Sequence, residues 1–159
     1  MTETQKKTSR VYKVVRLYTD PKIMQWHSYV TYGEFAVLYC LGETTRPVTG
    51  SGPLMAFRSL RLARQFVTFV PEEDGAILYC DAEITDPQPA SISEFPTSRN
   101  IGLFWQGNPH PYLRSVAPPI GTVFCDSITP RSIYRRMMWK WKKREAEREA
   151  LRGAISGRR

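Results

Sequence analysis

The sequence predicts one α+β domain built on a small mixed, mostly antiparallel sheet, with one short packing helix and a long basic helix at the carboxyl terminus. Three observations lead to this prediction. Several segments are rich in β-branched and aromatic residues and end at turn residues, one segment has apolar residues at helical spacing, and the last thirty residues combine helical spacing with many Lys and Arg. A length of 159 residues fits one domain.

The charge divides the chain into regions. Residues 1–129 hold 12 basic and 12 acidic side chains, whereas residues 130–159 hold 11 basic and 3 acidic ones, so the whole net charge of +8 lies in the last segment. We expect a flexible amino terminus over residues 1–9, a domain over 10–129, and a basic helix and tail over 130–159. Attraction to an acidic partner should be directed to that tail.

The first half of the domain is predicted to hold strands and one loop. Residues 10–18 are dominated by Val, Tyr and Leu and are followed by turn residues, which predicts a strand. Residues 27–41 predict one or two further strands, with Gly33 marking a bulge or a hairpin turn. Residues 42–53 hold three glycines and two prolines, which is typical of a loop.

A short amphipathic helix and a clear strand follow. Ser59 is the predicted N-cap, and Pro71 ends the helix. The apolar positions at helical spacing are Leu60, Ala63, Phe66, Val67 and Val70. Residues 76–84 alternate apolar and polar side chains, with Ala76 and Cys80 on the apolar face and Asp81 on the other, which predicts a half-buried strand.

The last third is predicted to be irregular and then helical. Residues 86–120 contain seven prolines, so we expect a long ordered loop with at most a short strand at 101–105. Residues 122–128 predict the last strand. Thr129 as N-cap and Pro130 as first helical residue then predict a helix to about residue 152.

The composition also predicts the cellular setting. No apolar run approaches the length of a membrane span, and the amino terminus is polar, so we expect a cytoplasmic protein, with nucleoid or nucleus as alternatives offered by the basic tail. Three widely spaced cysteines, Cys40, Cys80 and Cys125, lie in apolar runs and predict reduced, buried thiols.

Few residues have the pattern of a catalytic or metal site. Asp81 and Glu83 lie two apart on a strand and could act as acid and base, but a solvated sheet face explains them better, because no nucleophile motif accompanies them. The two histidines, His27 and His110, lack metal-ligand spacing. Arg46 could hold an anion in the glycine-containing loop, which has no phosphate-binding motif. No cofactor is predicted.

The strongest functional signal lies in the predicted terminal helix. Tyr134, Met137, Met138 and Trp141 would form an apolar stripe that docks on the domain, while Trp139 points into a cationic face. The predicted partner-binding residues are Arg135, Arg136, Trp139, Lys140, Lys142, Lys143 and Arg144. An indole among cations can stack on a base while its neighbours meet phosphates.

Other interpretations of this segment stay open. Lys and Arg stems can simply cover the indole, the Trp and Met residues can lie in a membrane interface, and residues 140–144 can serve as an address or a protein-docking helix. A solvated basic helix end without any ligand is also possible.

Four segments together carry a resemblance to known sequences. They are Val11-Tyr12-Lys13-Val14-Val15, residues 50–57 (Gly-Ser-Gly-Pro-Leu-Met-Ala-Phe), the helix with Ala63-Arg64-Gln65-Phe66, and Gly121-Thr122-Val123-Phe124. The chain resembles, over residues 10–129, a small uncharacterised α+β domain of phage and bacterial hypothetical proteins. The resemblance implies a fold and an accessory role in a phage or prophage, without an activity.

A fainter likeness is to the ADP-ribosyltransferases, in which a helix ending like Ala63 to Phe66 precedes a strand like residues 77–83. The resemblance implies a nicotinamide nucleotide bound in a cleft between the glycine-containing loop and the proline-rich segment. The family's early Arg or His and later Tyr and Glu have no counterparts here in the proper order. We therefore expect a non-enzymatic protein that binds nucleic acid or an acidic protein, with the transferase as alternative.

Overall fold

The computed structural model describes residues 8–17, 26–28, 33–68, 75–94, 97–107 and 114–136. The strands are β1 (Thr8–Leu17), β2 (Trp26–Ser28), β3 (Leu38–Tyr39), β4 (Leu54–Phe57), β5 (Gly75–Ile84), β6 (Ile92–Ser93), β7 (Ser115–Val116) and β8 (Thr122–Arg136). The helices are the 3-10 turn η1 (Gly33–Phe35), α1 (Leu60–Thr68) and α2 (Ser98–Trp105). This is the predicted α+β class with a mostly antiparallel sheet.

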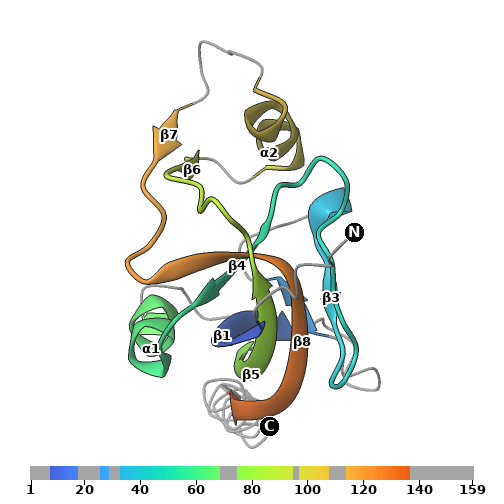
Figure 1. Cartoon of the computed structure of the whole chain (residues 1–159), viewed down its shortest axis with the longest axis vertical. Coiled ribbons are helices and arrows are strands. Elements are labelled where there is room, and N and C mark those ends of the chain that lie inside the picture. Colours follow the sequence, from blue (N-terminus) through green and yellow to red (C-terminus); the bar gives the residue numbers. More distant parts are fainter. Residues whose placement is uncertain are drawn as a thin grey trace, which may run out of the picture.

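The main sheet closes on itself. Its strand order is β3-β2-β1-β4-β8-β5, and β1 also pairs with β5 from Thr8 to Arg16, so β1, β4, β8 and β5 form a ring of antiparallel pairs. In Figure 1, β5 and β8 curve strongly around this ring. The bridge between Thr45 and Ile128 joins the loop after β3 to β8 as well. The result is a small barrel, which leaves few open edges.

The inside of the barrel is one apolar core. Alternate residues of β5, from Ala76 to Ala82, point inward and are buried, as the sequence alternation predicts. The inward residues of the other strands complete the core: Val11, Val15, Trp26, Val37, Tyr39, Leu54, Ala56, Val123, Cys125 and Ile128. Among the cysteines, Cys80 and Cys125 are free and buried as predicted, whereas Cys40 is only partly buried.

Helix α1 covers part of the outside of the barrel. The Ser59 hydroxyl accepts a 3.3 Å hydrogen bond from the Leu62 backbone N–H, which confirms Ser59 as the N-cap. The helix packs Ala63 and Phe66 on a second cluster that contains Val14, Phe57 and Ile77. Gly121 allows close approach, because a Cβ there would lie 2.1 Å from a Leu62 side-chain carbon.

Residues 86–120 are more regular than predicted. The short strand considered at 101–105 is not formed, because these residues belong to α2, whose N-cap Thr97 accepts a hydrogen bond from the Asn100 backbone N–H. The short strands β6 and β7 pair beside it. Together they form a lobe at one end of the barrel, at the top of Figure 1. Apolar residues at 101, 103, 104 and 105 suit one turn of either helix or strand, so the local pattern was ambiguous.

The predicted start of the terminal helix is also wrong. β8 continues through Thr129 and Pro130 to Arg136 and pairs with β5 over its whole second part. Pro130 is tolerated there because it lies at a register shift of the ladder, opposite Cys80. The rest of the predicted helix lies outside the described residues. At the other end, β1 begins at Thr8, two residues inside the segment predicted to be flexible.

Candidate binding surfaces

Three irregularities in the β5–β8 ladder build the most distinctive outer surface. At each register shift, one residue of β8 stands opposite no residue of β5, and these residues are Asp126, Arg131 and Tyr134. A bulge turns the side chain of the extra residue away from the regular alternation. Each of the three then contacts another part of the molecule through its side chain, so the bulges position specific groups.

The bulge at Arg131 creates an ion pair with the strand next to it. Its Nε donates to Asp81 Oδ2 at 2.7 Å, and both side chains keep partial access to water, at 53% and 30% exposure. Asp81 therefore lies on a solvated outer face, as its alternation with buried Cys80 and Ala82 requires. This charge pair adds little stability at such exposure but fixes the position of Arg131.

The bulge at Tyr134 brings an aromatic ring to α1. The Arg64 guanidinium carbon lies 5.4 Å from the centroid of the Tyr134 ring, and Arg64 Nη2 donates to the Tyr134 hydroxyl at 3.2 Å. Tyr134 remains 46% exposed. The Arg64 guanidinium thus fixes the orientation of a partly exposed aromatic ring.

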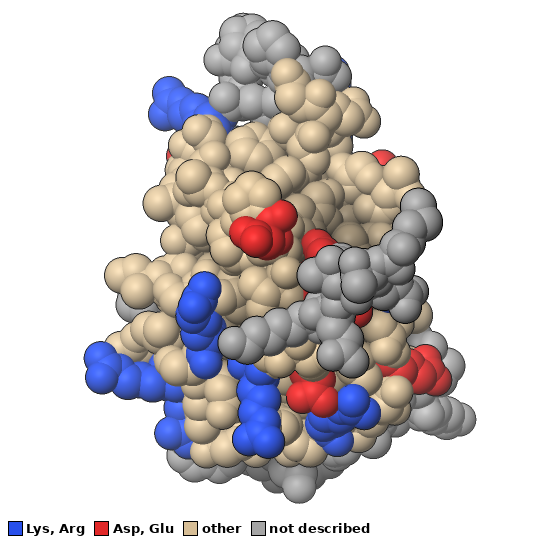
Figure 2. All heavy atoms as spheres, in the orientation of Figure 1, with Lys and Arg blue, Asp and Glu red and all other residues tan. Residues whose placement is uncertain are grey.

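Two more tyrosines continue this face across the barrel. The rings of Tyr12 and Tyr79 meet edge to face, with centroids 5.8 Å apart, and both are partly buried. Arg10 is exposed and lies in register with Asp81. We call this set the β8 surface, and it consists of Arg10, Tyr12, Arg64, Tyr79, Arg131 and Tyr134. In Figure 2, Lys and Arg side chains gather over the lower part of the molecule, where α1 and the barrel lie in Figure 1.

Only two of the seven predicted partner-binding residues fall in the described part of the chain. Arg135 and Arg136 are the last residues of β8, in register with Ile77 and Ala76. They are thus in a strand and not in the predicted helix. Five others lie outside the described residues: Trp139, Lys140, Lys142, Lys143 and Arg144.

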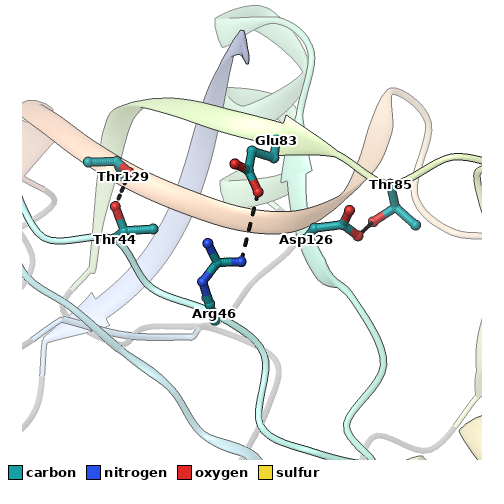
Figure 3. A network of polar contacts seen from close by, with 6 residues as sticks. All are labelled: Thr44, Arg46, Glu83, Thr85, Asp126 and Thr129. Carbon is teal, nitrogen blue, oxygen red and sulfur yellow. Dashed lines mark hydrogen bonds and ion pairs between the residues drawn. The ribbon is translucent and has the colours of Figure 1, made fainter. Parts of the chain in front are cut away.

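Asp81, Glu83 and Arg46, which the sequence offered for acid–base chemistry or anion binding, are engaged in contacts with one another or with β8. Arg46 Nη1 lies 3.8 Å from Glu83 Oε2, as Figure 3 shows beside the hydrogen bonds of Thr85 with Asp126 and of Thr44 with Thr129. These contacts tie the loop of residues 42–53 and the end of β5 to β8. Asp81, Glu83 and Arg46 form ion pairs on the outside of the barrel and do not line the cavity described next.

A cavity of about 140 Å³ lies between the barrel and the lobe formed by α2, β6 and β7. Its lining includes residues of the glycine-containing loop and of the proline-rich segment, between which a cleft was expected. Asp81, Glu83 and Arg46 are not among the lining residues. Lys13 is the basic side chain in its lining, and Glu94 is the acidic one. The remaining lining residues are Phe35, Val37, Ser51, Pro53, Leu54, Met55, Ile92, Ser93, Ile101, Trp105 and Val116.

Lys13 is buried, with only 5% of its surface exposed. Its Nζ donates a 2.7 Å hydrogen bond to the Met55 carbonyl and lies 5.2 Å from the centroid of the Tyr39 ring. Burial lowers the pKa of Lys13 to about 8, and the same burial raises the pKa of the nearby Cys80 and Cys125 thiols to about 12. The sequence signal for this lysine is its place between Val11 and Val15, two inward positions of the same strand.

The described residues include no group of three or more His, Cys, Asp and Glu side chains that could hold a metal ion. His27 lies in β2, where burial and then the charge of Arg16 lower its pKa, and His110 lies outside the described part. In the described portion no helix is long and apolar enough to cross a membrane. Compared with known proteins, the chain matches no family model, and neither curated proteins nor solved structures show a significant similarity.

Proposed function

We propose that this chain is a non-enzymatic binding protein that engages single-stranded nucleic acid through the β8 surface and the basic segment that follows it. One observation carries the proposal. The strand that ends in Arg135 and Arg136 presents an exposed tyrosine under an arginine, and the entire net charge of the chain lies in the last residues of this strand and the segment that follows it, residues 130–159.

The chemistry of this surface matches what a single strand offers. Arginine and lysine side chains attract phosphates, and the attraction does not depend on base sequence. Tyrosine rings offer flat faces on which unpaired bases stack, with a gain of about 1 to 3 kcal/mol per base. Tyr134 and Arg64 contact each other and so provide an aromatic face and a positive charge at one place. Trp139 would add a second stacking face beyond β8.

The chain up to the end of β8 contributes the smaller part of the net charge. Residues 1–136 carry 15 basic and 12 acidic side chains, whereas residues 137–159 carry 8 basic and 3 acidic ones, and Arg131 is partly neutralised by Asp81. The protein would therefore use the barrel as a rigid platform and the terminal segment for electrostatic capture. An accessory protein of a phage or prophage that modulates a host system would fit such a role.

The test is fluorescence anisotropy with a labelled single-stranded oligonucleotide. Because Tyr134 would stack on a base, Tyr134→Ala should weaken binding by about 1 to 3 kcal/mol. Arg114→Ala is the matched control for Arg64→Ala, because both arginines are exposed and Arg114 lies in the lobe away from β8. We expect Arg64→Ala to weaken binding and Arg114→Ala to leave it unchanged.

An acidic protein is the alternative partner. A poly-glutamate peptide with the same number of charges as the oligonucleotide separates the two, because a peptide without bases gains nothing from stacking. Tighter binding of the peptide than of the oligonucleotide would contradict the nucleic-acid proposal and favour the acidic protein.

A further inference from the structure

The cavity next to Lys13 has the composition of a small-molecule site, and it is separate from the β8 surface. Its lining is mainly aliphatic and aromatic, with one buried amine and a few hydroxyl and carboxylate groups near it. Ligand sites in proteins are typically apolar hollows with a few placed polar groups, and the mouth of a barrel is one of their usual locations.

The amine defines the polarity of the ligand. A buried ammonium group interacts strongly with an opposite charge, because the surroundings screen it less than water does. Glu94, the acidic residue of the lining, has an exposed side chain, so water screens its charge. The cavity therefore favours an anionic group directed at Lys13 over a cationic group directed at Glu94.

The volume defines the size of the ligand. A cavity of about 150 Å³ in another protein admits benzene, and the cavity here measures about 140 Å³. A single ring or a short branched chain fits this space beside the Trp105 and Phe35 side chains. Trp105 is fixed in its place, because it packs so closely on Gly52 that a Cβ there would lie 2.1 Å from the indole.

The cavity also reaches the surface. Val116 in β7 is 37% exposed and Glu94 is exposed, although both belong to the lining. The cavity can thus be reached from the surface beside Glu94 and Val116. Lys13 contributes to its lining from β1.

We propose that this cavity binds a small apolar carboxylate, with its ring or chain between α2 and the barrel and its carboxylate on the Lys13 ammonium. The binding needs no covalent step and no cofactor. It is independent of nucleic-acid binding, since none of the β8 surface residues lines the cavity.

Calorimetry or ligand-detected NMR on the full chain tests this with three probes of similar shape: benzoate, toluene and benzylamine. We expect benzoate to bind, toluene to bind more weakly and benzylamine not to bind. Lys13→Met keeps the length of the side chain and removes its charge. It should lower the affinity for benzoate by about ten- to a hundred-fold, the usual effect of losing a hydrogen bond to a charged group, and leave that for toluene equal or higher.

A second pair of variants tests whether benzoate binds in this cavity without changing Lys13. Val116→Trp should obstruct the cavity and abolish benzoate binding, whereas Val48→Trp should not, because Val48 has nearly the same exposure of 38% and does not line the cavity. Absence of benzoate binding at millimolar concentration would overturn the proposal. Benzoate binding that survives both Lys13→Met and Val116→Trp would overturn it as well.

Discussion

Lys13 shows how one residue can oppose the stability of the fold that surrounds it. Its aliphatic stem fits an inward position of β1, but its ammonium loses hydration on burial, and its contacts include the Met55 carbonyl and the Tyr39 ring. Burial accordingly lowers the pKa of Lys13 from 10.5 to about 8. A charged residue that lowers stability at a buried position is best explained by a function. Binding of a carboxylate in the cavity would be such a function.

The lowered pKa predicts how stability depends on pH. Between pH 8 and 10.5 the unfolded chain binds more protons at Lys13 than the folded chain does, so the free energy of unfolding rises with pH across this window. At pH 7 the unfavourable charge costs about 3 kcal/mol. Lys13→Met should therefore raise the free energy of unfolding at pH 7 by about that amount, and the difference should shrink towards pH 10.5.

Denaturant titrations of both proteins at several pH values measure this difference. Burial raises the pKa of Cys80 and Cys125, which lowers stability above pH 9, and the interaction of both thiols with the Lys13 charge makes this loss differ between the two proteins, so the comparison is made between pH 7 and pH 9. If the difference in the free energy of unfolding between the two proteins stayed constant from pH 7 to pH 9, the charge of Lys13 would not be destabilising in the native state.

At the scale of elements, β8 decides the architecture. It pairs with β4 on one side and with β5 on the other, and it closes the barrel. Its second part, from Ile128 to Arg136, supplies Ile133 to the core and Tyr134 to α1. The residues that the sequence pattern assigned to the start of a helix are thus part of the strand that completes the sheet.

This extension predicts the effect of truncation. A chain ending at Arg131 loses the ladder partners Ser132 and Ile133 and the burial of Ile133, so its free energy of unfolding should fall by at least about 2 kcal/mol. A chain ending at Arg136 keeps the complete ladder and should melt cooperatively. Circular dichroism melts measure both, and equal melting temperatures for the two chains would contradict the structural role of β8.

The sequence predicted elements well where one local signal dominated. Alternation in β5, the Ser59 cap and the periodicity of α1 depend on neighbours within the same segment, and all three are confirmed. The prediction failed at Thr129 and Pro130, which match the N-cap and first residue of a helix. Pairing with β5, fifty residues away in the sequence, overrides this local preference.

The candidate sites were harder to predict from the sequence, because they depend on the bulges of the β5–β8 ladder and on the closure of the barrel. Nothing local marks Arg131 and Tyr134 as the extra residues of a ladder, and their contacts with Asp81 and Arg64 join segments far apart in the chain. The cavity was expected between the correct two segments, but its basic residue comes from β1. Only the closing of the barrel brings Lys13 to it.

At the scale of the whole molecule, residues 1–129 have no net charge, and the net charge of +8 lies in the end of β8 and the segment that follows it, residues 130–159. This division predicts that binding to an anionic polymer depends on residues 130–159, with the barrel surface adding stacking and orientation. Each phosphate contact releases counterions, so the salt dependence of the affinity counts the contacts. Stacking on Tyr134 changes the affinity without changing that count.

The most direct test is therefore the salt dependence of single-strand binding, measured by anisotropy for the full chain and for variants. If four or five phosphates are neutralised, the logarithm of the association constant should fall with the logarithm of salt concentration at a slope of about −3 to −4. Lys142→Ala with Lys143→Ala should reduce the steepness by about 1 to 1.5, whereas Trp139→Ala and Tyr134→Ala should lower the affinity at an unchanged slope. An affinity and slope that stay the same after deletion of residues 135–159 would contradict the account.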